Sequence, residues 1–405
     1  MKTVFCPRIY TLRTAYLETK ISADHSAWDS LFCRCVAMGF DHILIEFPIT
    51  NASTRSSPDV VAIANQLKSL LQACAKHGLS LLLDLTLNPM AANHPLPLQY
   101  PHYFSFCWND ENQAELAPLP DPRRRSTPSA WRFARLDCPE VTAFLQDYWQ
   151  QQLKAFIAVG VAGFRCLGLG HVPAAFWTSL ISTCRKTQSK VHFLAWTCGT
   201  TPQQINALLG CGFDASFSSV PWWNFKSDWF TQEHARLMRL APAIAFPECP
   251  EQDRQSPSLQ GNEPALQRQL RLRSLQFSAA VGQGLMIPMG FEYGHCTQPS
   301  APLADDTDLE KLQVLSGWDL SPEITAANHW VATLPRARLR ILSSPNTTPA
   351  LLLRGEFSSA TGGVLILVNA DPFQAQSISG ALWRKRTRAY QCGKLLMANN
   401  PVLVH

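Results

Sequence analysis

The stretch GVAGFRCLGLGHVPAAFW at residues 160–177, followed by HFLAWTCG at residues 192–199, decides how this chain folds. A short apolar run around Phe164 ends at glycines, a helix-like segment follows Pro173, and a second apolar run begins at Phe193. Strand-like segments that alternate with helix-like ones are typical of a parallel sheet covered by helices. This stretch therefore predicts two neighbouring parallel strands joined by a helix.

The same alternation continues along most of the chain and predicts an α/β fold, a (β/α)8 TIM barrel. Such a barrel carries its active site at the carboxyl ends of its strands, so the candidate residues are sought there. Strands are expected at residues 8–12, 42–47, 81–85, 163–166, 193–197, 215–218, 243–246 and 285–289. Helices are expected at residues 59–77, 141–159, 173–186, 201–209, 228–240 and 264–281.

Two segments depart from this pattern. The proline-rich connection after the third strand, residues 89–138, is too long for an ordinary loop and predicts an inserted lobe. After residue 334, short apolar runs separated by Gly, Ser and Pro predict a small C-terminal antiparallel β domain. The expected organisation is a barrel over residues 1–334, which includes the lobe at 89–138, and a short β domain over residues 335–405.

The composition indicates a large buried core and excludes several classes of protein. The 405 residues are 46% hydrophobic and 16% charged, which is outside the disordered class. The net charge of +5 is dispersed, and its only dense basic run, Arg123 to Arg125, is interpreted as a solvated loop and not as a nucleic-acid patch. The 13 cysteines are scattered without a CxxC pair, which predicts reduced thiols and no metal site. Without a secretory segment or a long apolar run, a cytoplasmic protein with no membrane partner is expected.

Five segments at or near the predicted strand ends form a recognisable set. They are GFRCL at 163–167, LLLDLTLNPM at 81–90, RLDCPEV at 135–141, FPECPEQDR at 246–254 and GLMIPMGFEYG at 284–294. These motifs resemble those of the alpha-amylase superfamily, and they are most similar to bacterial members related to the maltosyltransferases of alpha-1,4-glucan. The resemblance extends over nearly the whole chain, and it implies a barrel that acts on alpha-glucan by a retaining mechanism.

The residues that the resemblance places at the catalytic positions cannot perform that reaction. In the family, strand four ends with an Asp nucleophile and strand five with a Glu acid/base, where this chain has Leu167 and Trp196. Pro250 replaces the substrate-binding His, and Glu251 stands where the family has the Asp that stabilises the transition state. Retaining cleavage needs two carboxylates roughly 5 Å apart, which Leu167 and Trp196 do not supply. We therefore expect no ordinary hydrolysis or transfer of alpha-glucan.

Other residues at strand ends are candidates for binding a sugar. Arg165 shares its strand face with Leu167, and a buried guanidinium needs a counter-charge, so a contact between Arg165 and Asp84 is predicted. Trp196 is expected to contact a ligand or to fill the pocket, and at least one of Trp222 and Trp223 is expected to be buried packing. Glu248 and Asp253 are interpreted as solvated loop carboxylates. The expected substrate-binding residues are Asp84, Asn88, Arg165, Trp196, Trp222, Glu248 and Glu292.

Three functions remain open from the sequence. The first is a catalytically silent protein that binds alpha-glucan or maltooligosaccharide, or regulates an active homologous enzyme. The second is a glycoside hydrolase or glucanotransferase with a rewired site, in which Glu248, Glu251 and Asp253 would be the acids. The third is a scaffold or interaction protein. We predict the first, and because the sequence has no glycine-rich phosphate loop and no HExxH motif, no cofactor and no metal are expected.

Overall fold

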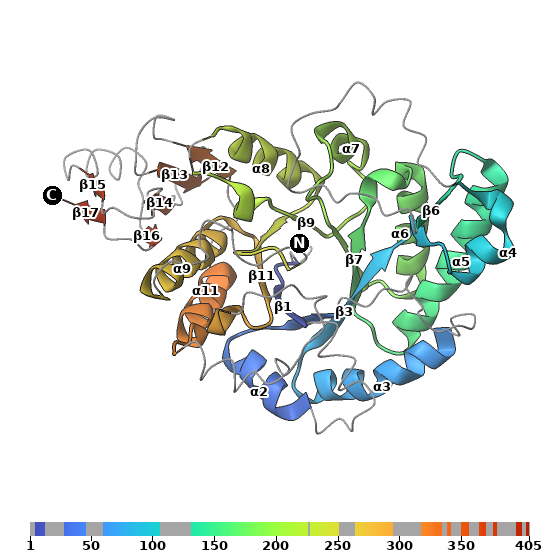
Figure 1. Cartoon of the computed structure of the whole chain (residues 1–405), viewed down its shortest axis with the longest axis horizontal. Coiled ribbons are helices and arrows are strands. Elements are labelled where there is room, and N and C mark those ends of the chain that lie inside the picture. The colour runs from blue at the N-terminus through green and yellow to red at the C-terminus, as the bar shows by residue number, and fades with distance from the viewer. Residues whose placement is uncertain are drawn as a thin grey trace.

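The structure is a computed structural model, shown in Figure 1. It describes residues 5–12, 28–45, 60–105, 131–225, 227–250, 264–294, 317–333, 338–341, 350–355, 364–369, 376–378, 394–398 and 402–404. Within these ranges, no helix is long and apolar enough to cross a membrane.

A closed barrel of eight parallel strands forms the centre of the molecule, in the order β1-β11-β10-β9-β8-β7-β3-β2. Each of the eight segments expected from the sequence forms one of these strands, with small shifts at the ends. The sequence prediction of a (β/α)8 barrel is therefore confirmed. The strands are β1 (Arg8–Leu12), β2 (His42–Ile45), β3 (Ser80–Thr86), β7 (Gly163–Leu167), β8 (His192–Ala195), β9 (Ala215–Phe217), β10 (Ala243–Ala245) and β11 (Gly284–Pro288).

Successive residues along each strand face opposite sides of the barrel wall, as the pleat requires. Ile9, Leu44 and Leu82 pack in the cluster that fills the barrel interior, whereas Tyr10 and Ile43 pack in the cluster between the wall and the helices. Both sets are fully buried. The strands therefore need nearly continuous apolar runs, which is the pattern that identified them in the sequence.

Helices surround the barrel, as Figure 1 shows. All six helices expected from the sequence are present, and two more, α2 and α11, were not expected. The described helices of the barrel region are α2 (Asp29–Ala37), α3 (Val60–Lys76), α5 (Pro139–Ala158), α6 (Ala174–Thr187), α7 (Pro202–Ala207), α8 (Trp229–Leu240), α9 (Pro264–Val281) and α11 (Ser321–Thr333).

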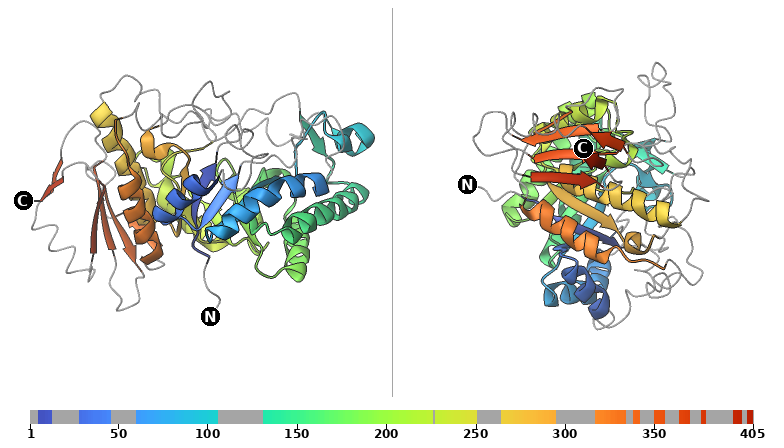
Figure 2. Two further views of the ribbon diagram at one scale, coloured as in Figure 1. Left: turned by 90° about the horizontal axis from the view of Figure 1, so that it is seen from below. Right: turned by 90° about the vertical axis from the view of Figure 1, so that its left-hand side faces the viewer.

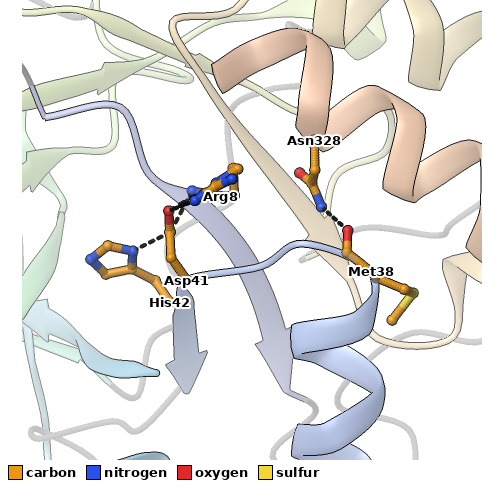
Figure 3. Close-up of polar contacts among 5 residues, drawn as sticks. All are labelled: Arg8, Met38, Asp41, His42 and Asn328. Carbon is orange, nitrogen blue, oxygen red and sulfur yellow. Dashed lines mark hydrogen bonds and ion pairs between the residues drawn. The ribbon is translucent and has the colours of Figure 1, made fainter. Parts of the chain in front are cut away.

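The two unexpected helices are tied to each other. The side-chain amide of Asn328 on α11 donates a 2.9 Å hydrogen bond to the carbonyl of Met38 at the end of α2 (Figure 3). Nearby, the Asp41 carboxylate accepts hydrogen bonds from the backbone and the guanidinium of Arg8 and contacts His42, which joins the entrances of β1 and β2. The first contact holds the end of α2 against α11, and the second set holds the starts of β1 and β2 together.

The connection after β3 forms a small substructure of its own. Three short strands pair antiparallel in the order β4-β6-β5, and a short helix precedes β5. The inserted lobe expected over residues 89–138 stays a proposal in its bounds, because residues 106–130 lie outside the described part of the chain. The described elements are β4 (Met90–Ala91), α4 (Pro95–Gln99), η2 (Pro101–Tyr103), β5 (Phe104–Ser105) and β6 (Trp131–Ala134).

The C-terminal strands stand beside α9, at the end of the molecule far from α4 (Figure 2). In the larger sheet, β12, β13 and β14 pair antiparallel as expected, and β16 joins β14 in parallel. Ile366 and Val368 of β14 pack with Phe277 of α9 in one buried cluster, which seats the sheet on the barrel. The strands are β12 (Arg338–Ile341), β13 (Ala350–Gly355), β14 (Val364–Val368) and β16 (Lys394–Ala398), with β15 (Gln376–Ile378) and β17 (Val402–Val404) as a separate pair.

Candidate active site

A buried ion pair lies at the carboxyl end of the barrel, where β3 and β7 run side by side. Asp84 and Arg165 are partners in the register of these strands and both face the barrel interior. Arg165 donates from Nε and Nη2 to the two carboxylate oxygens of Asp84, at 2.6 and 2.7 Å. The exposed fraction of Arg165 is 0%. The contact expected from the sequence is confirmed, and its bidentate geometry is the strongest form of such a pair.

Trp196 covers the other side of the same guanidinium. Its ring centroid lies 4.7 Å from the Cζ atom of Arg165, within the range of a cation–π contact. The ring also stacks on Phe246 at 5.3 Å and packs against Phe217 at 4.9 Å. With an exposed fraction of 8%, Trp196 forms part of the packing of the barrel interior. Arg165 is thus held between a carboxylate and an indole.

Leu167 is the last residue of β7, and it lies opposite Thr86 in the register with β3. Because it is two residues beyond Arg165, its side chain faces the same side of the strand. It packs, half-buried, against the apolar cluster that contains Trp196 and Phe246. The position that resembles the nucleophile of the family is therefore occupied by a hydrocarbon side chain that packs against aromatic rings.

Asn88 braces the backbone behind the site. The side-chain amide of Asn88 donates to the carbonyl of His171 and accepts from the amide of Ala134, both at 3.0 Å. The Asn88 carbonyl also lies so close to Gly168 that a Cβ atom there would approach it to 2.8 Å, which explains a glycine at this turn. Asn88 is fully buried. These contacts make it a link between β3, the turn after β7 and β6.

Glu248 is buried in the connection after β10, paired with a helix. Arg271 of α9 donates from Nη1 to Glu248 Oε2 at 3.0 Å, and its guanidinium lies over the ring of Phe291 at 5.5 Å. Both charged side chains are buried. The interpretation of Glu248 as a solvated loop carboxylate was wrong, because an arginine from a helix distant in sequence compensates its charge.

Glu292 belongs to a third arginine pair, on the outer side of the barrel wall. Tyr10 donates from its hydroxyl to Glu292 Oε1 at 2.7 Å, and Arg34 of α2 donates to the same oxygen at 2.8 Å. Burial, followed by the charge of Glu292, raises the pKa of Tyr10, so this hydroxyl keeps the proton that it donates. Tyr10 packs in the outer cluster, and Ile9 beside it packs in the inner one. Glu292 is therefore on a different side of the wall from Asp84.

The neighbouring residues Trp222 and Trp223 separate into different clusters. Trp222 is half-buried and meets the edge of Phe246 at 6.0 Å, next to Trp196. Trp223 has an exposed fraction of 4% and stacks on Phe230 and Phe277, under the C-terminal sheet. The expectation that at least one of this pair is buried packing is confirmed.

The structure thus brings Asp84, Arg165, Leu167, Trp196 and Trp222 together at the barrel mouth. It holds Asn88, Glu248 and Glu292 in separate polar contacts. Glu251 and Asp253 lie outside the described residues. In the part of the chain that the structure describes, no three His, Cys, Asp or Glu side chains are grouped to hold a metal ion.

Sequence reasoning missed the arginines that pair with Glu248 and Glu292, and the phenylalanines beneath Trp196. Arg271 and Arg34 lie on helices, and their partners follow from how those helices dock, which no local pattern encodes. Phe217 and Phe246 carried a usable signal, because Phe217 ends β9, the neighbour of β8, and Phe246 directly follows the next strand, β10.

No family model matches the chain. It is 28% identical over 417 residues to the alpha-1,4-glucan:maltose-1-phosphate maltosyltransferase of Burkholderia pseudomallei (strain K96243), which covers 99% of this chain and 33% of that protein. It is 26% identical over 333 residues to the protein of the same description from Myxococcus xanthus (strain DK1622), which covers 76% of this chain and 46% of that protein. The chain spans less than half the length of either relative.

Solved structures share the fold. The alpha-amylase of Geobacillus thermoleovorans in complex with acarbose superposes with a TM-score of 0.59 at 16% identity, over 87% of this chain and 84% of that one. An Anoxybacillus alpha-amylase superposes with a TM-score of 0.62 at 16% identity, over 90% and 86%.

Proposed function

We propose that this chain is a member of the alpha-amylase superfamily that binds alpha-glucan without cleaving it, as a glucan binder or as a regulator of an active homologous enzyme. The observation that carries the proposal is that apolar and aromatic side chains occupy the barrel mouth at the positions that resemble the family's catalytic carboxylates. Leu167 and Trp196 stand at the ends of β7 and β8, and Trp196 covers an Arg165 guanidinium whose charge Asp84 already balances.

The candidate acids that the structure describes support the same proposal. Asp84, Glu248 and Glu292 each pair with an arginine, and both oxygens of Asp84 accept hydrogen bonds from Arg165. A nucleophile must direct a free lone pair at the anomeric carbon, and a general acid must carry a transferable proton. Carboxylates held in these pairs are occupied by structural contacts.

Binding of glucan is supported by the half-buried ring of Trp222 beside Trp196. A flat indole at the mouth of a barrel offers an apolar surface that suits the face of a sugar ring. The relatives from Burkholderia and Myxococcus carry alpha-1,4-glucan in their descriptions, which suggests a maltooligosaccharide as the first ligand to test. We further propose that the protein works in the cytoplasm, since the ten cysteines within the described ranges are free thiols.

Isothermal titration calorimetry of the whole chain with maltoheptaose, followed by a reducing-sugar and chain-length assay on the same sample, tests the proposal. We expect heat of binding without any product, and no heat with cellohexaose, whose linkages are β. Trp222→Ala should weaken binding on the order of ten-fold through the lost stacking surface. Trp229→Ala is the matched control, because this half-buried ring packs in the cluster under the C-terminal sheet.

Each other outcome points to a different function. Formation of product would refute a non-catalytic protein and direct the search for acids to Glu251 and Asp253. Absence of both heat and product would refute glucan binding and leave a scaffold that uses the barrel for another interaction.

A further inference from the structure

Away from the barrel mouth, a thiol, an imidazole and a carboxylate form a chain of contacts on the surface. Cys33 Sγ lies 3.7 Å from His77 Nδ1, within reach of a hydrogen bond to sulfur. His77 Nε2 lies 2.8 Å from Asp29 Oδ1. Both ring nitrogens of His77 are thus engaged, one by the nucleophile and the other by the acid, which is the order found in activated cysteine sites.

Local structure holds the three groups in this order. Asp29 and Cys33 are four residues apart on α2, so they lie one turn apart on the same helix face. His77 directly follows α3, and its backbone amide bonds to the carbonyls of Ala73 and Cys74. Gly78, with φ of 70°, then turns the chain away. The imidazole therefore projects from a fixed helix end toward α2.

The groups around His77 orient its ring toward the thiol. A hydrogen bond from Lys76 and then one from His77 lower the pKa of Asp29, so its carboxylate is ionised near neutral pH. An Asp that accepts from Nε2–H leaves Nδ1 as the acceptor for the thiol. The imidazolium that results lies at the carboxyl end of α3, where the helix dipole favours a positive charge. Lys76 Nζ lies 2.6 Å from the other carboxylate oxygen of Asp29, so Asp29 is held between Lys76 and His77.

Cys33 is also accessible. Of the ten cysteines within the described ranges, it is the only exposed one, while Cys6 and Cys138 are half-buried and the rest are buried. Burial raises the pKa of Cys35, two residues away on the inner face of α2, and keeps it protonated. Helix α2 therefore carries two different thiols, an accessible one at Cys33 beside a base and an unreactive, buried one at Cys35.

We propose that Cys33 is a reactive nucleophilic thiol that is reversibly modified by small-molecule disulfides, with His77 as its base and Asp29 as a positioning residue. The Cys33 proton moves to His77 Nδ1, and the thiolate attacks one sulfur of the disulfide. A new mixed disulfide bond forms on Cys33 as the original sulfur–sulfur bond breaks, and the departing thiolate takes the proton from His77 or from water. One disulfide is exchanged for another, so no further oxidant is needed.

The test uses the reduced whole chain, glutathione disulfide at pH 7 as the probe, and peptide mass spectrometry to follow each cysteine over time. The rate at Cys33 in the folded chain is compared with the rate at Cys33 in urea, where neighbours no longer act. We expect the folded chain to react on the order of ten-fold faster at this residue, because the thiolate fraction of an ordinary cysteine is small at pH 7. Dithiothreitol should reverse the modification.

Variants separate the roles of the neighbours. His77→Asn should remove the enhancement at Cys33, and His329→Asn, at an exposed histidine of α11, is the matched control that should leave it unchanged. Asp29→Asn should lower the rate in part, and Asp29→Glu should restore it, which a merely structural role would not require. Circular dichroism establishes that each variant is folded, with His77→Gln as the second choice if His77→Asn is not.

Two results would overturn the proposal. One is a folded rate at Cys33 within about two-fold of the unfolded rate. The other is a rate that His77→Asn and His77→Gln leave unchanged in folded protein.

Discussion

Replacing Asp84 with alanine should destabilise the barrel by about 3–5 kcal/mol, because the substitution leaves the fully buried guanidinium of Arg165 without its carboxylate. The lost contacts are two charge-assisted hydrogen bonds, each worth about 1.5–3 kcal/mol. Trp196 covers the guanidinium with or without Asp84, so this contact does not offset the loss. The free energy of unfolding should therefore fall by about 3–5 kcal/mol.

Urea denaturation followed by tryptophan fluorescence measures this loss from the midpoint and slope of the transition. The matched control is Glu323→Ala, which breaks the half-exposed pair with Arg268 and should cost only about 0–1 kcal/mol. The double variant Asp84→Leu with Arg165→Met removes both charges and should recover most of the stability. If Asp84→Ala cost no more than Glu323→Ala, the inference that Arg165 depends on this carboxylate would be wrong.

Three further changes test other contacts. Asn328→Ala removes the donor to the buried Met38 carbonyl and should cost about 1–3 kcal/mol; an unchanged melting temperature would contradict this. Burial lowers the pKa of His94 to about 4, whereas the unfolded value is about 6.5. The folded protein therefore binds this proton less readily than the unfolded chain. The stability that the neutral ring contributes is complete above pH 6.5 and is lost as the pH falls toward 4. His94→Asn keeps an acceptor for the Leu96 amide and should flatten the melting temperature between pH 7 and 4.5; an equal slope in both proteins argues against this role. Because Trp196 packs in the barrel interior, Trp196→Ala should lower the free energy of unfolding by about 3–5 kcal/mol, and Trp196→Phe should lower it less, in the same urea assay. Small, equal losses in the two variants would show that the ring does not stabilise the fold.

The fold was predictable because its signal is local. Each barrel strand is buried on both sides, so its apolar run is nearly continuous and stands out between turns. The two helices that sequence analysis missed have a weaker signal. On α11 the buried residues Ile324, Ala327, Asn328 and Val331 do recur at helical spacing, but two of the four are small or polar. On α2 the buried face consists of Leu31, Phe32 and Cys35, on only nine residues.

Some contacts of the candidate site could be predicted from local sequence, and others could not. The pair of Asp84 and Arg165 followed from strand alternation and from the cost of a buried charge, both of which can be worked out from the sequence. The pair of Glu248 and Arg271 depends on how α9 docks against the connection after β10. Residues 23 positions apart meet there only in the folded chain. Contacts between a strand end and a helix elsewhere in the sequence cannot be predicted from local patterns, because they depend on how the helix packs in the folded protein.

The separation of Trp222 from Trp223 has a mechanical consequence. One peptide bond joins a ring at the barrel mouth to a ring wedged beneath β14. A ligand that displaces the first ring would pull on the second, and close packing transmits such a displacement instead of absorbing it. A substitution that shifts Trp222 is therefore expected to disturb the packing of Trp223 beneath β14 as well.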